Sequence, residues 1–189
     1  VFNKVRSHEV DKIKSVGAKV LERIGTRLVG IVPYSPAVDA PTMMDVLERV
    51  SGRVLYGEKY LGNRVKTVQV GAMSAHNAMP RLKEKALLIT AGDRTDLLLA
   101  VVVKCLRAKE EAPVAGVVLT GGIVPDPKVM ELFRNLPIPV ISVKEDSYTT
   151  AARIKSIDLK VSPSDEAKIA LIKDLINRYL DVERILERL

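Results

Sequence analysis

The sequence has no tryptophan, one cysteine and only seven Phe and Tyr residues among 189. A lone cysteine cannot form an internal disulfide, and no Cys/His cluster has the spacing of a metal site, so we expect neither disulfide nor metal. Proteins that bind single-stranded nucleic acid stack the bases on aromatic side chains, and this sequence has few aromatic rings to offer. Cys105 lies inside an apolar run, and we expect it in the core.

Long hydrophobic runs are also absent. None reaches the ~18 residues that a membrane span needs, and residues 1–20 are mixed and charged, unlike a secretory signal. We therefore expect a cytoplasmic protein with no membrane partner. The net charge is +7, but the 30 Lys and Arg residues are dispersed among 23 Asp and Glu residues. This pattern does not favour nucleic acid as a partner. A single Gln beside many Glu, Lys and Arg residues hints at a thermophile.

What the sequence does contain is a regular alternation of strand-like and helix-like segments. Residues 1–33 predict a strand, a helix that stops at Gly25, and a second strand. Further strands are predicted at 53–56, 66–71, 86–90, 114–119, 140–143 and 160–162, with helices between most of them. The alternation predicts an α/β fold with three layers, a mainly parallel sheet between helices, plus a C-terminal helix.

Several helix boundaries can be predicted from local signals. We expect Ser7 to cap the first helix, Pro41 to occupy a first helical position, and Ser164 to start the C-terminal helix. A helix of about residues 95–109 is apolar nearly all round and should be buried on every side. Other helices are predicted from Asp126 to Leu136, and from Asp146 or Ser147 through Ile154.

The strongest candidate site is the turn that contains Asp93 and Arg94. It follows the apolar strand 86–90 and opens the helix after it, which is where α/β sheets bind ligands. Thr120, Gly121 and Gly122 end the next strand along the chain. Arg94 suits bidentate binding of an anion or nucleotide. Asp93 spaced three residues before Asp96 also resembles a capping box, and an Asp–Arg pair that locks two loops explains the same residues, so both interpretations stay open.

These motifs resemble the DRTGG domain. The resemblance rests on Asp93-Arg94, on Thr120-Gly121-Gly122 and on the run 143–151, and it covers roughly residues 34–160. In this family the domain is often joined to an N-terminal dethiobiotin-synthetase-like P-loop domain. That combination occurs in BioD-like phosphotransacetylases and in the regulatory half of long phosphate acetyltransferases.

The resemblance implies three parts. Residues 1–33 look like the end of such a P-loop domain, residues 34–163 form the DRTGG domain, and residues 164–189 form the C-terminal helix. No G-x-x-x-x-G-K-[ST] motif occurs in the chain, so the phosphate cradle of that P-loop is missing. No nucleophile is spaced to work with a base. We therefore expect no catalytic residue, no cofactor and no catalytic activity in this chain.

The function expected is that of a regulatory or oligomerisation module. It would bind a small anionic metabolite or nucleotide at Asp93, Arg94, Thr120, Gly121 and Gly122. The alternative is an accessory part of a BioD-like ATP-dependent or acetyl-transfer enzyme whose P-loop lies outside this chain. An apolar seam on helix 164–189 and the incomplete β-α-β unit at residues 1–33 also predict a homodimer or higher oligomer.

Overall fold

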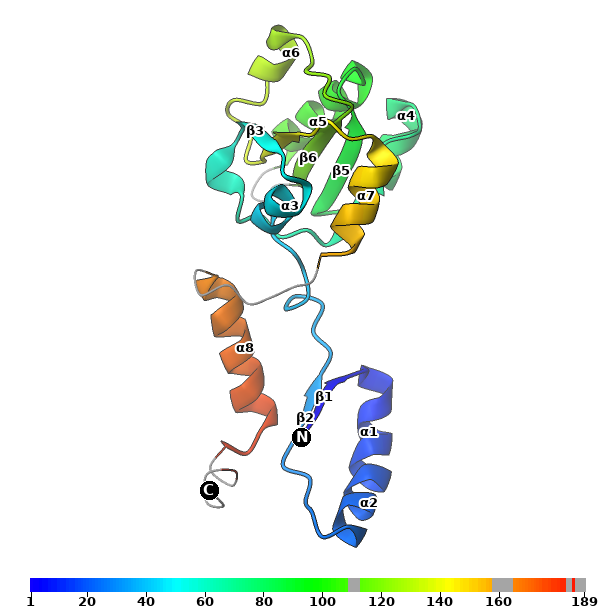
Figure 1. Cartoon of the computed structure of the whole chain (residues 1–189), viewed down its shortest axis with the longest axis vertical. Coiled ribbons are helices and arrows are strands. Elements are labelled where there is room, and N and C mark those ends of the chain that lie inside the picture. The colour runs from blue at the N-terminus through cyan, green and yellow to red at the C-terminus, as the bar shows by residue number, and fades with distance from the viewer. Residues whose placement is uncertain (109–112, 158–164, 183–184, 186–189) are drawn as a thin grey trace. The chain divides into compact units, whose positions relative to one another are not determined.

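The computed structural model describes residues 1–108, 113–157, 165–182 and 185. The chain divides into two compact units, one made of residues 1–39 with 160–189, the other of residues 40–159. Each unit is described by itself below, with the elements labelled as in Figure 1. The strand predicted at 160–162 and the cap predicted at Ser164 lie outside the described residues.

The unit of residues 40–159 is built on a five-stranded sheet with the order β3-β7-β6-β5-β4. The strands β4 to β7 lie parallel to their neighbours, and β3 runs antiparallel beside β7. The mainly parallel sheet expected from the sequence is thus confirmed. The strand bounds are Arg53–Tyr56 for β3, Thr67–Val70 for β4, Ala86–Ala91 for β5, Val114–Thr120 for β6 and Val140–Ser142 for β7.

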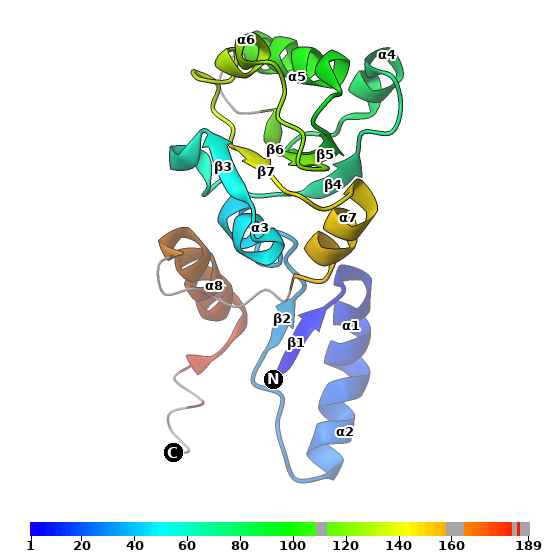
Figure 2. The same ribbon diagram turned by 45° about the horizontal axis from the view of Figure 1, so that its top comes forward.

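Helices cover both faces of this sheet, as Figure 2 shows. On one face lie α5, Thr95–Arg107, and α6, Pro127–Glu131, with the short α4, Ala75–Ala78, beside α5. On the other face lie α3, Met43–Val50, and α7, Ser147–Lys155. A separate apolar cluster fills each side of the sheet. The predicted three-layer α/β architecture is therefore confirmed.

The helix α5 corrects one expectation. Its inner face is buried through Leu97, Leu98, Val101, Val102 and Cys105. Its outer face, however, exposes Leu99, Val103 and Leu106, which are 41%, 53% and 71% accessible. The prediction of burial on every side was wrong because α5 lies in an outer layer, where one helix face has no sheet to pack against.

Two other helix boundaries differ from the prediction. The helix α3 begins after Thr42, not at Pro41, because Thr42 and Asp45 form a reciprocal capping box in which each side chain accepts a hydrogen bond from the other's backbone N–H. The helix α6 ends at Glu131, well before Leu136. The predicted cap of α7 is confirmed, since Asp146 accepts hydrogen bonds from the N–H groups of Tyr148 and Thr149.

The other unit begins with two short parallel strands, β1, Phe2–Val5, and β2, Ile31–Pro33. A helical run joins them. Its segments are α1, Val10–Lys12, a π-helical stretch, Ile13–Gly17, and α2, Ala18–Arg23. Ser7 lies in a 3-10 turn before this run and does not cap it. Gly25 follows α2 with φ +75°, the left-handed stop that the sequence predicts.

The same unit contains α8, Glu166–Tyr179, which is capped by the Asp165 side chain. Immediately after α8, Leu180 forms an antiparallel bridge with Gly30 at the start of β2. A side chain at position 30 would overlap the carbonyl oxygen of Tyr179, so glycine permits this close approach. A single β-bridge thus joins the segment after α8 to the residue that precedes β2.

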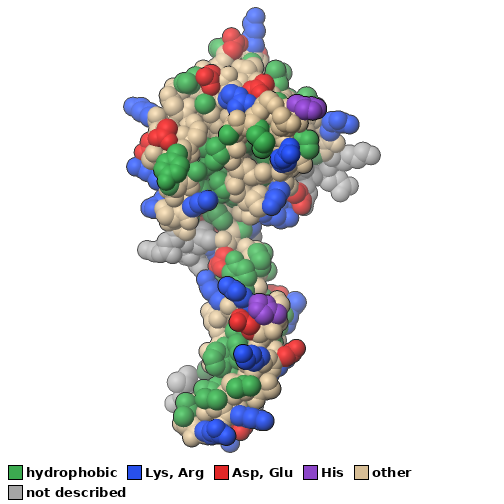
Figure 3. Space-filling model, turned by 90° about the vertical axis from the view of Figure 1, so that its right-hand side faces the viewer, with side chains coloured by type: hydrophobic (Ala, Val, Ile, Leu, Met, Phe, Trp, Pro, Cys, Tyr) green, Lys and Arg blue, Asp and Glu red, His purple; other side chains and the backbone are tan. Residues whose placement is uncertain are grey.

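Apolar side chains are also exposed on the helical run of this unit. Val16, Val20 and Ile24 are among the exposed large hydrophobic residues. Figure 3 shows green side chains among the basic and acidic ones over these helices. Across the part of the chain that the structure describes, no helix combines the length and hydropathy needed to cross a membrane.

Candidate strand-end site

The loops that follow the parallel strands β5 and β6 meet at one end of the sheet. Ala91 pairs with Thr120 in the strand register, and the Gly92 N–H donates to the Thr120 carbonyl oxygen at 3.3 Å. A Cβ atom on Gly92 would overlap the carbonyl oxygen of Ile123, so only glycine allows the two loops to come this close. The structure therefore brings the turn of Asp93 and Arg94 next to the loop of Thr120, Gly121 and Gly122.

The Arg94 guanidinium makes four hydrogen bonds within the protein. It donates to both carboxylate oxygens of Asp96 at 2.9 Å, and to the carbonyl oxygens of Gly71 and Met73 at 3.0 and 2.7 Å. The hydrogen bond from Arg94 lowers the pKa of Asp96 to about 2, and the same bond raises the pKa of Arg94. Arg94 thus ties the start of α5 to the loop that follows β4.

Asp93 does not have the partner that the sequence suggested. The N-cap position of α5 is Arg94, without a side-chain capping bond, so the capping box of Asp93 with Asp96 was wrong. Asp96 lies in the first helical turn, where side chains point back towards the N-terminus, and there it meets Arg94 and accepts from the Ala75 N–H at 3.2 Å. The Asp93 side chain is exposed.

Gly121 and Gly122 form a left-handed pair with φ of +80° and +68°. Their N–H groups point at the loop after β7, donating to the carbonyl oxygens of Glu145 at 2.7 Å and Val143 at 2.9 Å. The buried Thr120 hydroxyl lies 2.7 Å from the hydroxyl of Ser147 at the start of α7. These residues therefore fasten the β6 and β7 ends to one another.

A groove of about 580 Å³ lies beside these loops. Residues of α3, β3, the β7–α7 loop and α7 line this groove. Of the five site residues predicted from the sequence, only Gly122 is among them. Because β3 runs antiparallel, Arg53 at its first position lies opposite Ser142 at the end of β7. The groove is lined by Val50, Ser51, Gly52, Arg53, Gly122, Val124, Ser142, Val143, Lys144, Glu145 and Arg153.

The groove is positively charged. Arg53, Lys144 and Arg153 line it together with a single carboxylate, that of Glu145. Arg153 binds Glu145 Oε1 at 2.8 Å, and Glu145 Oε2 is buried without a hydrogen-bond partner among the described residues. Within the described ranges, no carboxylate forms an ion pair with Arg53 or Lys144. Two cations are therefore available to a ligand.

Sequence reasoning missed Arg53 and Arg153 as site residues. Lys144 could have been found, since it comes directly after an apolar strand, where ligand contacts are common. Arg53 precedes its strand, and only the antiparallel direction of β3 brings it to this end of the sheet. No local signal in the sequence gives that direction.

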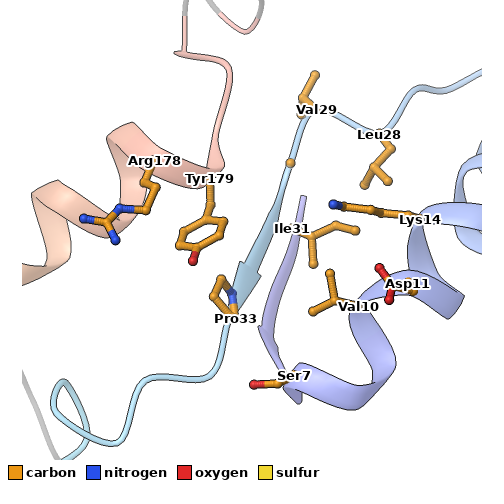
Figure 4. Close-up of a pocket in the computed structure, with 11 residues that line it drawn as sticks. Ser7, Val10, Asp11, Lys14, Leu28, Val29, Ile31, Pro33, Arg178 and Tyr179 are labelled. Carbon is orange, nitrogen blue, oxygen red and sulfur yellow. The ribbon is translucent and has the colours of Figure 1, made fainter.

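A second hollow, of about 590 Å³, lies in the unit of residues 1–39 and 160–189. Figure 4 shows Arg178 and Tyr179 of α8 on one side of β2, and Val10, Asp11 and Lys14 on the other. The charged groups come from opposite sides of the strand and do not converge on one point. Among the residues covered by the structure, no three His, Cys, Asp or Glu side chains are grouped as a metal site.

The fold and its fastened strand-end loops define a small α/β domain whose signature is an Asp-Arg turn beside a Thr-Gly-Gly loop. The chain belongs to the DRTGG domain family, whose model matches residues 45–157.

The chain is also similar to phosphate acetyltransferases. It is 32% identical to that of Pseudomonas putida over 165 residues, which is 86% of this chain and 23% of that protein. It is 30% identical to that of Nitratidesulfovibrio vulgaris over 195 residues, covering 100% of this chain and 27% of that one. The chain thus spans about a quarter of the length of these relatives.

A solved structure has the same fold. It is described as the CBS and DRTGG domains of the regulatory region of Clostridium perfringens pyrophosphatase complexed with an activator, diadenosine tetraphosphate. The match has a TM-score of 0.50 and 16% sequence identity, and covers 94% of this chain and 86% of that one. At this identity, the likeness concerns the fold.

Proposed function

We propose that the chain is a non-catalytic regulatory module that binds a small anionic metabolite or nucleotide in the strand-end groove. The observation that carries the proposal is the convergence of Arg53, Lys144 and Arg153 from three separate elements around one carboxylate. A concave site lined by one sign of charge concentrates ligands of the opposite sign. A volume of about 580 Å³ is in the range of small-molecule sites.

In this proposal the signature residues have different roles. Gly122 contacts the ligand, because it lines the groove and its missing side chain leaves room for a phosphate. Arg94, Thr120 and Gly121 belong to the adjoining loops and hold the site in shape, since the Arg94 guanidinium, the Thr120 hydroxyl and the Gly121 N–H are already engaged. The exposed Asp93 side chain lies outside the groove. Arg53 and Lys144 bind the anion directly.

Two comparisons support the proposed ligand class and setting. The pyrophosphatase regulatory region of the same fold is described in complex with a nucleotide activator, and the curated relatives are phosphate acetyltransferases. We propose that this chain serves as a regulatory part of an acetyl-transferring system in the cytoplasm and that it self-associates. The alternative, an accessory part of an ATP-dependent enzyme, would need a P-loop from outside the 189 residues, since none is present in them.

Titration of the full chain with ATP, ADP, acetyl phosphate and inorganic phosphate, followed by calorimetry and thermal unfolding, tests the ligand. We expect at least one of these anions to raise the Tm, with binding that weakens as salt is added. The double variant Arg53→Ala/Lys144→Ala should bind about tenfold more weakly or worse. Lys128→Ala, an exposed position on α6 outside the groove, is the control and should bind normally.

The proposal is wrong if none of the four anions binds at low ionic strength, or if the double variant binds as well as the wild type. A separate assay tests the absence of catalysis. The chain alone should not exchange acetyl groups between acetyl phosphate and coenzyme A, and measurable turnover would overturn that part.

A further inference from the structure

The outer face of α5 carries a stripe of exposed apolar side chains, Leu99, Val103 and Leu106, here called the α5 seam. Their spacings of four and three residues keep them on one side of the helix, as in the seam of a coiled coil. Between them in the sequence, Val101, Val102 and Cys105 face the core of the same unit. A contiguous exposed apolar stripe on a folded domain marks an interaction surface.

A hollow of about 490 Å³ lies alongside the α5 seam. Met79, Ala100 and Val103 supply its apolar lining, and Lys104 and Arg107 border it. The Lys104 ammonium is held by the Leu82 carbonyl oxygen at 2.6 Å. Leu106 is 71% exposed on the same helix. The α5 seam therefore presents a protruding leucine near each end of the contact, and in an antiparallel pair Leu106 of one copy lies level with Leu99 of the other, which is the self-complementarity that a two-fold interface requires.

Charge is distributed along α5 in a way that selects one orientation. Asp93 and Asp96 lie at its N-terminal end, and Lys104 and Arg107 lie at its C-terminal end. If two copies meet antiparallel with Val103 near the axis, Arg107 of one copy lies level with Leu99 of the other. Asp96 of the second copy is then within one helical turn, about 5 Å along the axis. A parallel arrangement would place like charges together.

We propose that two copies of this chain associate through the α5 seam, with their α5 helices antiparallel and Leu106 of each packed against Leu99 of the other. The proposal deepens the self-association part of the proposed function by naming its surface. It is independent of the anion groove, which contains no residue of α5, so either can fail without the other.

The test is the oligomeric state of the full chain, measured by sedimentation velocity over a wide range of concentrations. We expect a dimer that Leu106→Glu weakens by about tenfold or more, because a carboxylate would be buried against Leu99 of the other copy. Leu106 is largely exposed, so the variant should fold and keep the far-UV spectrum and anion binding of the wild type. Met44→Glu is the matched control, since Met44 is also exposed and lies on α3, on the opposite face of the sheet. It should dimerise normally.

A cross-link tests the antiparallel register. Val103→Cys should form an inter-chain disulfide on mild oxidation, while the wild type should not, because its only thiol, Cys105, is buried. A wild-type monomer at every concentration would overturn the proposal. So would a dimer that Leu106→Glu leaves intact, or one that Met44→Glu or Ile176→Glu on α8 disrupts instead.

Discussion

Arg94 binds Asp96 through two parallel hydrogen bonds, each 2.9 Å long. The same guanidinium reaches the carbonyl oxygens of Gly71 and Met73 in the loop after the neighbouring strand. The residue that looks most like an anion ligand in the sequence is thereby committed to holding two loops together. Its replacement should affect stability first, and ligand binding only through the shape of the site.

Replacing Arg94 should destabilise the domain. Arg94→Ala removes the donors to two backbone carbonyls, one of them on the buried Gly71, and we expect a loss of about 2 kcal/mol in the free energy of unfolding. Arg94→Lys should recover little of this stability, because an ammonium group cannot reproduce the planar set of N–H donors of a guanidinium. Urea denaturation measures both. Arg134→Ala, which removes only an exposed pair with Glu131, should change stability by less than about 0.5 kcal/mol.

Asp96 should make the protein sensitive to acid. Its folded pKa is about 2, below the ordinary value of 3.8, so its charge stabilises the fold above about pH 4. That contribution is lost as the pH falls from about 4 towards 2. Asp96→Asn should therefore flatten the pH dependence of stability in this window. The effect should be under about 1 kcal/mol, since the pair is solvent-exposed, and an unchanged acid limb would contradict the prediction.

Gly92 is the position where the two signature loops come closest. Gly92→Ala would drive a Cβ atom into the Ile123 carbonyl, and we expect destabilisation of about 2 kcal/mol. Gly62 offers a matched control, because a Cβ there meets nothing within 4 Å and its φ is not positive. Gly62→Ala should be neutral or stabilise by about 0.5 kcal/mol. Thermal unfolding of the two variants side by side decides the matter.

The Thr120 and Ser147 hydroxyls form a part-buried pair at 2.7 Å. Removing either one leaves the other without its partner, so Thr120→Val and Ser147→Ala should each cost about 1–2 kcal/mol. The double variant should cost less than the sum of the two. A double-mutant cycle measured by urea denaturation should give a coupling of about 1 kcal/mol. Additive losses would mean that the hydroxyls act separately.

Cys105 should be chemically inert in the folded protein. Burial raises the pKa of its thiol to about 11 from an ordinary 9.0, so at pH 8 the thiolate fraction falls about 100-fold. Iodoacetamide should label the native chain at least that much more slowly than the unfolded chain. Labelling at equal rates would show that the α5 region opens readily.

Local signals in the sequence predict much of the fold. The strand before Asp93, the cap at Asp146 and the left-handed stop at Gly25 are all confirmed, because each depends on residues close by in the chain. The helix start predicted at Pro41 was wrong, because the capping box of Thr42 and Asp45 fixes the N-terminus of the same helix after Thr42.

Interactions between distant segments account for the differences. The apolar pattern of α5 gives no sign of which side meets the sheet, so the exposure of Val103 could not be foreseen. Arg53 joins the candidate site only because β3 lies beside β7. Arg94 reaches the carbonyl oxygens of Gly71 and Met73 only because β4 lies beside β5.

The place of β3 at the edge of the sheet has a consequence for how this domain is made. β3 precedes the other four strands of this sheet, yet among the described residues its one neighbour in the sheet is β7, which is synthesised about 90 residues later. On the ribosome, β3 must therefore wait until nearly all of the domain has emerged. Closing so large a loop makes folding slow, and any product that stops before Val140 leaves the buried strand β6 at an edge of the sheet, without the strand that pairs with it in the complete domain.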